Sequence, residues 1–174
     1  IDLAKWRTFT MREAILEFWP EAAGAKPKII DLSDASLLRE FFERSERAIE
    51  QRVDMSTFPD EDDAIEANQM VHFRISNLRQ QLQHDPLGKV IAELFEYLAE
   101  PHLIQPTIIY EFPLAVSPLS KQKPDEPDWV ERFEFYIGGF EVGNAFSELN
   151  DPEDQRRRFE QQLLEKERGD DEAH

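Results

Sequence analysis

The sequence predicts an α+β fold, in which an antiparallel sheet is backed by helices and carries a helical insertion. Three observations lead to this prediction. Apolar residues recur at helical spacing through residues 33–98. Strand-forming residues gather in residues 106–121 and 130–149, and Gly138-Gly139 marks a tight hairpin turn within the second stretch. Residues 152–168 then have the pattern of a final amphipathic helix.

Composition limits the classes of partner. The chain has 174 residues and 40% hydrophobic content, enough for one domain with a core. Its net charge of -17 disfavours a phosphate backbone as partner unless a local basic patch exists. The best basic run, residues 156–158, lies among acidic residues, so we interpret it as a solvated helix face. The sequence contains no cysteine, which excludes disulfides and thiolate metal sites.

Residues 1–24 are expected to supply one strand and one helix. "WRTFT" alternates large and polar residues, as a short strand does. "TMRE" then fits a capping box, with the hydroxyl of Thr10 at the N-cap and the carboxylate of Glu13 three residues later. The helix is expected to stop before Pro20, because proline disfavours helical geometry in the residue that precedes it.

Residues 25–105 are expected to form a helical insertion module. Three helices are predicted, over residues 33–52, 64–83 and 87–98, separated by "TFPDEDD" and "HDP". Nothing in this module has the pattern of a chemical site. We therefore expect a structural or partner-facing role for it.

Residues 106–174 are expected to hold the remaining strands, the hairpin and the last helix. A strand is predicted around residues 108–110, followed by a charged, proline-rich loop at 121–129 and the hairpin at 130–149. The last helix has Asp151 as its cap and Pro152 in its first turn, and it is expected to end at Gly169.

The hairpin turn fixes which side chains share a face, since opposed residues of antiparallel strands point the same way. One face would carry five apolar residues and pack in the core: Phe133, Phe135, Ile137, Phe140 and Val142. The other face would carry Glu134, Tyr136 and Glu141. Two close carboxylates repel each other, and a divalent cation would relieve that repulsion. The alternative is that both are solvated, or paired with Arg132 or with a lysine elsewhere.

Strict alternation beyond this point would place Asn144, Phe146 and Glu148 on the apolar face, where an unpaired carboxylate is costly. A bulge at Gly143 would shift the phase by one residue and remove the conflict. These three residues would then line one surface with Glu134 and Glu141. The hypothesis is a polar pocket that binds magnesium and a small cationic ligand together.

Three segments resemble a known family. "PTIIYEFPLAVSPLSK", "ERFEFYIGGFEVGNAFSELNDPEDQRRRFEQQ" and "GDDEA" are similar to the catalytic domain of class II lysyl-tRNA synthetases, over residues 106–174. The similarity is weaker over residues 2–14 and around "LFEYLAE", and poor in the rest of the helical module. The resemblance implies part of a class II aminoacyl-tRNA synthetase sheet. It also implies a reaction, in which lysine and ATP form lysyl-adenylate and the lysyl group then moves to tRNA.

The resemblance also assigns residues. It implies that Glu134 and Glu141 hold magnesium against the phosphates of ATP. It implies that Asn144, Phe146 and Glu148 line the lysine pocket, with Glu148 at the ε-ammonium and Phe146 against the aliphatic stem. No catalytic residue is assigned within the chain.

The family resemblance also gives expectations for the parent protein. The phosphate-clamping arginines of the family are expected outside this sequence, so we expect a fragment that lacks activity when isolated. The parent is expected to be a homodimer in the cytoplasm, with lysine, ATP and tRNA as partners and no membrane association.

Two alternatives stay open. One is a synthetase paralogue that lysylates a translation factor; such relatives typically lose the "SPL-K" pattern and carry histidine where Ser147 stands, so residues 117–121 and Ser147 favour the synthetase. The other is a non-catalytic domain that binds lysine or a partner. Lysine binding that depends on Glu148 would separate the synthetase from a non-catalytic domain.

Overall fold

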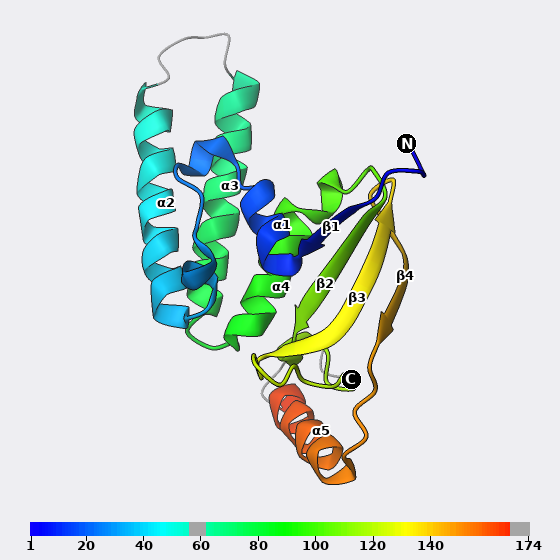
Figure 1. Ribbon diagram of the computed structural model, residues 1–174. Helices are drawn as coiled ribbons and strands as arrows, with labels where there is room; N and C mark the ends of the chain where they lie inside the picture. The colour runs from blue at the N-terminus through cyan, green and yellow to red at the C-terminus, as the bar shows by residue number, and fades with distance from the viewer. Residues whose placement is uncertain (56–61, 168–174) are drawn as a thin grey trace.

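The computed structural model describes residues 1–55 and 62–167, which form helices beside one four-stranded sheet (Figure 1). The strands, in their order across the sheet, are β1 (Arg7–Thr10), β2 (Thr107–Pro113), β3 (Trp129–Ile137) and β4 (Phe140–Phe146). The pairs β2/β3 and β3/β4 are antiparallel, whereas β1 and β2 are parallel. The α+β prediction is confirmed, but the sheet is mixed rather than wholly antiparallel. The helical module explains this, since parallel neighbours require a long crossover connection.

The helices follow the predicted ranges closely. Their bounds are α1 (Met11–Glu17), α2 (Ala35–Met55), α3 (Asp62–Gln81), α4 (Leu87–Leu98) and α5 (Pro152–Glu167). In Figure 1, α2 and α3 stand side by side away from the sheet, α4 lies against it, and α5 lies beyond its far end. Most of the predicted break between α2 and α3, the predicted helix end at Gly169 and the "GDDEA" segment lie outside the described residues. None of the described helices is long and apolar enough to span a membrane.

The capping box joins β1 to α1 without a loop. The Oγ1 of Thr10 accepts from the amide of Glu13 at 3.1 Å, and the Glu13 carboxylate accepts from the Thr10 amide at 2.8 Å. This reciprocal pair satisfies two amides that would otherwise lack partners at the helix start. The direct connection fixes Arg12 near the end of β2, where it takes part in an ion cluster described below.

One apolar cluster runs through the three predicted segments. It includes Met11 and Ile15 of α1, Phe42 of α2, Phe95 of α4 and Ile109 of β2, all at most 1% exposed. Helix α4 therefore connects the helical module to the sheet through buried side chains. The division into residues 1–24, 25–105 and 106–174 stays a prediction.

On strand β3 of the hairpin, the face that packs in the core is the polar one, whereas no residue of β4 is buried. Tyr136 is 2% exposed, and its ring meets that of Phe95 with 6.1 Å between centroids. On the opposite face Phe140 is 73% exposed and Val142 57% exposed. The expectation that the aromatic face of the hairpin would pack in the core is therefore wrong. The reason is non-local: α4, on the helical module, covers the face that carries Glu134 and Tyr136.

Candidate functional site

The hairpin turn is formed as predicted. Gly138 and Gly139 have φ of 69° and 81°, in the left-handed region that favours glycine. Their amides donate to the carbonyls of Ile104 and Leu103 at 2.9 and 3.1 Å. These bonds tie the turn to the segment that follows α4, so the register of β3 and β4 is fixed at one end.

The predicted bulge is confirmed, with Val142 as its extra residue next to Gly143. Tyr136 pairs with Glu141, and the following residue of β3, Phe135, pairs with Gly143. A Cβ added to Gly143 would meet the Phe135 ring at 3.7 Å, an ordinary contact. The space around Gly143 would therefore accommodate a side-chain Cβ, so the bulge does not require glycine at this position for steric reasons.

The bulge brings four of the five predicted site residues onto one face of the hairpin. Glu134 pairs with Asn144, and Arg132 pairs with Phe146, while Glu141 lies opposite Tyr136. Because paired residues share a face, Glu134, Glu141, Asn144 and Phe146 lie on the same side of the sheet. The Nδ2 of Asn144 donates to Glu141 at 2.7 Å. The two sets assigned to magnesium and to lysine are thus neighbours.

Glu134 is a buried carboxylate with two donors. It is 4% exposed, and it accepts from Arg132 Nη2 and from the hydroxyl of Tyr136, each at 2.5 Å. Burial raises the pKa of Glu134, the Tyr136 and Arg132 contacts lower it, and the charge of Glu141 raises it further. The pairing with Arg132 that the sequence left open is therefore present in the structure.

A third carboxylate, Glu100, adds to the negative charge near Glu134. Burial raises the pKa of Glu100, and the charges of Glu134 and Glu141 raise it further. Burial and the adjacent Glu134 also raise the pKa of Tyr136. A cation bound at this face would offset the repulsion among these carboxylates.

The donor set is compatible with magnesium held jointly with phosphate. Within residues 1–55 and 62–167, no group of three or more histidine, aspartate or glutamate side chains is arranged to hold a metal ion. Magnesium is usually bound by one or two carboxylates together with substrate phosphates, rather than by a cage of protein ligands. Glu134 and Glu141 fit that pattern, although Arg132 donates to Oε1 of Glu134 and Tyr136 donates to its Oε2, so a metal ion would share each oxygen with a protein donor.

Glu148 lies just beyond β4 and is exposed. Its backbone is held between two neighbours. Ser147 donates to the carbonyl of Glu131 at 2.9 Å and accepts from the amide of Lys121 at 2.7 Å, and Leu149 donates to the carbonyl of Leu119 at 2.9 Å. Ser120 and Glu148 form an isolated antiparallel bridge. Segment 119–121 therefore fixes the backbone position of Glu148.

The structure corrects the interpretation of the basic run. Arg156 and Arg157 are exposed, as expected, but Arg158 is 6% exposed and bound to backbone carbonyls. The available sequence signal was its spacing from Asp154, four residues earlier on the same helix face. That spacing marks an ion pair but does not reveal contacts with a segment 36–40 residues away.

A cluster of ion pairs was also not predicted from the sequence. Arg12 donates to Glu126 at 2.9 and 3.0 Å and to Glu111 at 3.3 Å, and Lys123 bridges the same two glutamates at 2.6 and 2.9 Å. The guanidinium of Arg12 also lies 4.1 Å from the centre of the Trp129 ring. Glu111, at the irregularity between β2 and β3, has φ of 61°. The cluster holds the loop before β3 against α1.

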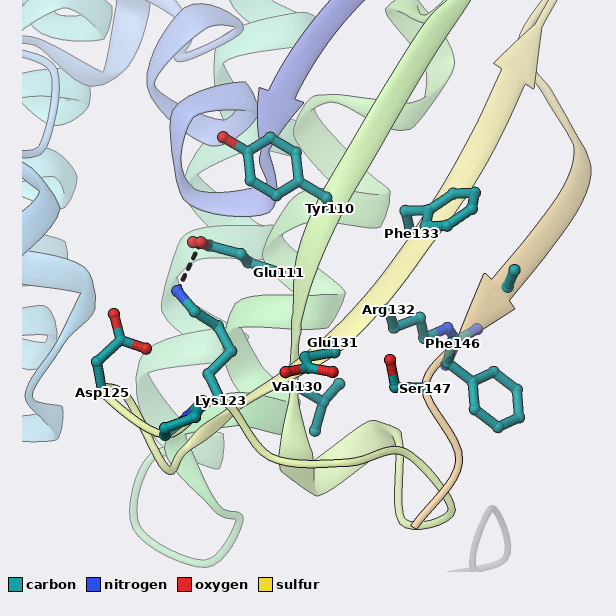
Figure 2. Close-up of a pocket in the computed structure, with 12 residues that line it drawn as sticks. Tyr110, Glu111, Lys123, Asp125, Val130, Glu131, Arg132, Phe133, Phe146 and Ser147 are labelled. Carbon is teal, nitrogen blue, oxygen red and sulfur yellow. Dashed lines mark hydrogen bonds and ion pairs between the residues drawn. The ribbon is translucent and has the colours of Figure 1, made fainter.

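A hollow of about 620 Å³ opens beside this cluster (Figure 2). Tyr110 and Phe133 line one side of it, and Lys123 and Glu111 are paired with each other at its rim. Phe146 also lines it, and is the one predicted site residue that does so. The hollow is therefore lined by one of the residues proposed to bind lysine, and Glu134 and Glu141 do not line it.

Comparisons with known proteins agree with the resemblance. The model of the family "tRNA synthetases class II (D, K and N)" matches residues 3–174. A lysine--tRNA ligase of Moorella thermoacetica is 61% identical over 87 residues, which cover 50% of this chain and 18% of that protein. Lysine--tRNA ligases of Halalkalibacterium halodurans and Cronobacter sakazakii are 61% and 58% identical over 87 residues, in each case 17% of the relative. The matched segment thus spans less than a fifth of these curated relatives.

Proposed function

Because the chain belongs to the class II tRNA synthetase family of the D, K and N group, we propose that it is part of the catalytic domain of a lysine--tRNA ligase. The proposed reaction joins lysine and ATP to form lysyl-adenylate, from which the lysyl group passes to tRNA. The observation that supports this most is the bulge after Glu141, which puts Asn144 and Phe146 on the face of Glu134 and Glu141. Relatives named lysine--tRNA ligase support the choice of lysine.

The lysine pocket is proposed to consist of Asn144, Phe146 and Glu148. Glu148 is exposed and suits the compact charge of an ε-ammonium group. Phe146 is 38% exposed, which leaves ring surface for the aliphatic stem. Asn144 is held by its bond to Glu141, so its position is coupled to the neighbouring carboxylate.

Glu134 and Glu141 are proposed to hold magnesium together with the phosphates of ATP. The metal ion would neutralise phosphate charge during displacement at the α-phosphate. Tyr136 and Arg132 fix the carboxylate of Glu134 by hydrogen bonds, and Asn144 fixes that of Glu141. These contacts orient both carboxylates.

The proposed setting is a parent protein that acts in the cytoplasm as a homodimer, with tRNA as its second substrate. The two alternatives, lysylation of a translation factor and a non-catalytic domain, are not favoured. The matched relatives are named lysine--tRNA ligases, and the chain keeps Ser147 and the residues 117–119.

Lysine-dependent exchange between ATP and pyrophosphate, measured on the full-length protein, tests the proposal. We expect exchange and tRNA charging with lysine, and a Glu148→Gln variant that binds lysine at least about tenfold more weakly by calorimetry. Glu153→Gln is the matched control, because Glu153 is an exposed glutamate in the first turn of α5. Lysine binding without exchange would instead support a binding module. No lysine binding by the wild type would refute the proposal.

A further inference from the structure

The guanidinium of Arg158 is buried where α5 meets segment 118–122. Its Nη1 donates to the carbonyls of Pro118 and Ser120 at 3.2 and 2.8 Å, and its Nη2 donates to Gln122 Oε1 at 3.2 Å and to Asp154 at 2.5 Å. A planar guanidinium can satisfy several acceptors at once because its donors form a rigid fork. The Arg158 side chain therefore binds mainly the backbone of segment 118–122.

Segment 118–122 has partners on both of its edges. On one edge, Leu119 accepts from the amide of Leu149, and the amide of Lys121 donates to Ser147. The carbonyls of Pro118 and Ser120, which alternate with these groups, bind Arg158 instead. Pro118 and Leu119 form a turn, in which the amide of Ser120 donates to the carbonyl of Ser117 at 3.1 Å, and Arg158 supplies donors to the carbonyls on both sides of Leu119.

We propose that Arg158 is a positioning residue for Glu148, which it holds in place through segment 118–122. The lysine-binding part of this inference rests on the proposed function. Arg158 is linked to Ser120, Ser120 forms a bridge with Glu148, and the residues on both sides of Glu148 are hydrogen-bonded to the same segment. Arg158 thus acts without touching the substrate.

The helix that carries Arg158 is anchored at its start. Asp151 accepts from the amides of Glu153 and Asp154 at 2.9 and 3.2 Å. Asp154 pairs with Arg158, and this hydrogen bond is the main cause that lowers the pKa of Asp154. The Asp154 carboxylate therefore balances the charge of the buried guanidinium and restricts its orientation.

Two variants and a control test the proposal. Arg158→Gln removes the charge and the fork, whereas Arg158→Lys keeps a positive charge beside Asp154 but lacks the fork. Arg156→Gln is the control, because Arg156 has a side chain that is 82% exposed and pairs along the helix with Glu160. Hydrogen exchange by NMR on this chain would follow the amides of Lys121 and Leu149, with the Gly138 amide as a distant internal reference.

In the Arg158 variants we expect the Lys121 and Leu149 amides to exchange at least about tenfold faster, with the Gly138 amide unchanged. In the full-length protein we expect KM for lysine in ATP–pyrophosphate exchange to rise about tenfold, while KM for ATP and kcat change little. The Arg158→Lys variant should lie between wild type and Arg158→Gln, and Arg156→Gln should match wild type. An Arg158→Gln variant that fails to fold leaves the decision to Arg158→Lys.

Unchanged amide exchange in the Arg158 variants would refute the proposal that Arg158 holds segment 118–122. Faster exchange with an unchanged KM for lysine would refute the link to Glu148, as would an equal rise in KM for ATP. If the wild-type protein shows no lysine-dependent exchange, the proposed function fails and the link to lysine fails with it, while the amide measurements still decide whether Arg158 holds the segment.

Discussion

Replacing Tyr136 by phenylalanine removes one hydroxyl group from the buried surroundings of Glu134. Tyr136 and Glu134 are 2% and 4% exposed, and the hydroxyl donates to the carboxylate at 2.5 Å. The ring itself, and its edge contact with Phe95, would remain, so no large cavity forms. A hydrogen bond to a charged group contributes about 1.5–3 kcal/mol. We therefore expect Tyr136→Phe to lower the free energy of unfolding by about 2 kcal/mol at neutral pH.

The loss should depend on pH with a definite sign. The Tyr136 hydroxyl lowers the pKa of Glu134, which burial raises, so the variant should raise that pKa further. The lost bond matters most where Glu134 is ionised, so the difference in unfolding free energy should shrink as pH falls through the folded pKa of Glu134. Urea unfolding followed by tryptophan fluorescence at several pH values measures this. Tyr110→Phe, at a residue 37% exposed, is the control.

Two results for Tyr136→Phe would contradict this reasoning. A variant within about 0.5 kcal/mol of wild type at neutral pH would mean that the hydroxyl does not stabilise the buried carboxylate. A loss of equal size at every pH would mean that the effect comes from packing rather than from the charge of Glu134.

Three further predictions concern the ion cluster and the hairpin. Arg12→Met should lower the free energy of unfolding by about 2 kcal/mol, measured by urea unfolding, because Glu111 and Glu126 lose their most buried donor and keep only their pairing with Lys123. A neutral effect would contradict this. Hydrogen bonds from Arg12 and Lys123 lower the pKa of Glu126 from 4.5 to about 2. The stability that Glu126 contributes is therefore present above pH 4.5 and is lost as pH falls toward 2. Glu126→Gln should therefore flatten acid unfolding in that window, and an unchanged slope would refute the assignment. Gly138→Ala should lower the free energy of unfolding by about 1 kcal/mol, because the φ of Gly138 is 69°. Gly143→Ala should lower it by less, because Gly143 has no positive φ.

Features encoded within a few neighbouring residues could be predicted from the sequence. The capping box of Thr10 and Glu13 depends on four residues, and the hairpin turn on Gly138-Gly139. The bulge could be inferred because strict alternation would have put Glu148 on an apolar face. The register Glu134–Asn144 then followed from counting, and with it the shared face of four site residues.

Features that depend on distant segments could not be predicted in this way. The parallel pairing of β1 and β2 depends on the path of the intervening module, and the choice of covered face depends on α4. An apolar face on a hairpin states a preference for burial, but it does not say where the covering helix comes from. Arg158 was likewise missed because its carbonyl partners are 38 and 40 residues away and have no side-chain signature.

The residues proposed to bind magnesium and those proposed to bind lysine are connected through residues 117–120, which are bound by two arginines. Arg132 binds Glu134 through Nη2 and the hydroxyl of Ser117 through Nη1, at 2.5 and 3.0 Å. Arg158 binds the carbonyls of Pro118 and Ser120, immediately after Ser117. The carboxylate proposed for magnesium and the one proposed for lysine are thus related through backbone held by two guanidinium groups. The link therefore fixes the backbone of Glu148 relative to the carboxylate of Glu134 without any contact between the two residues.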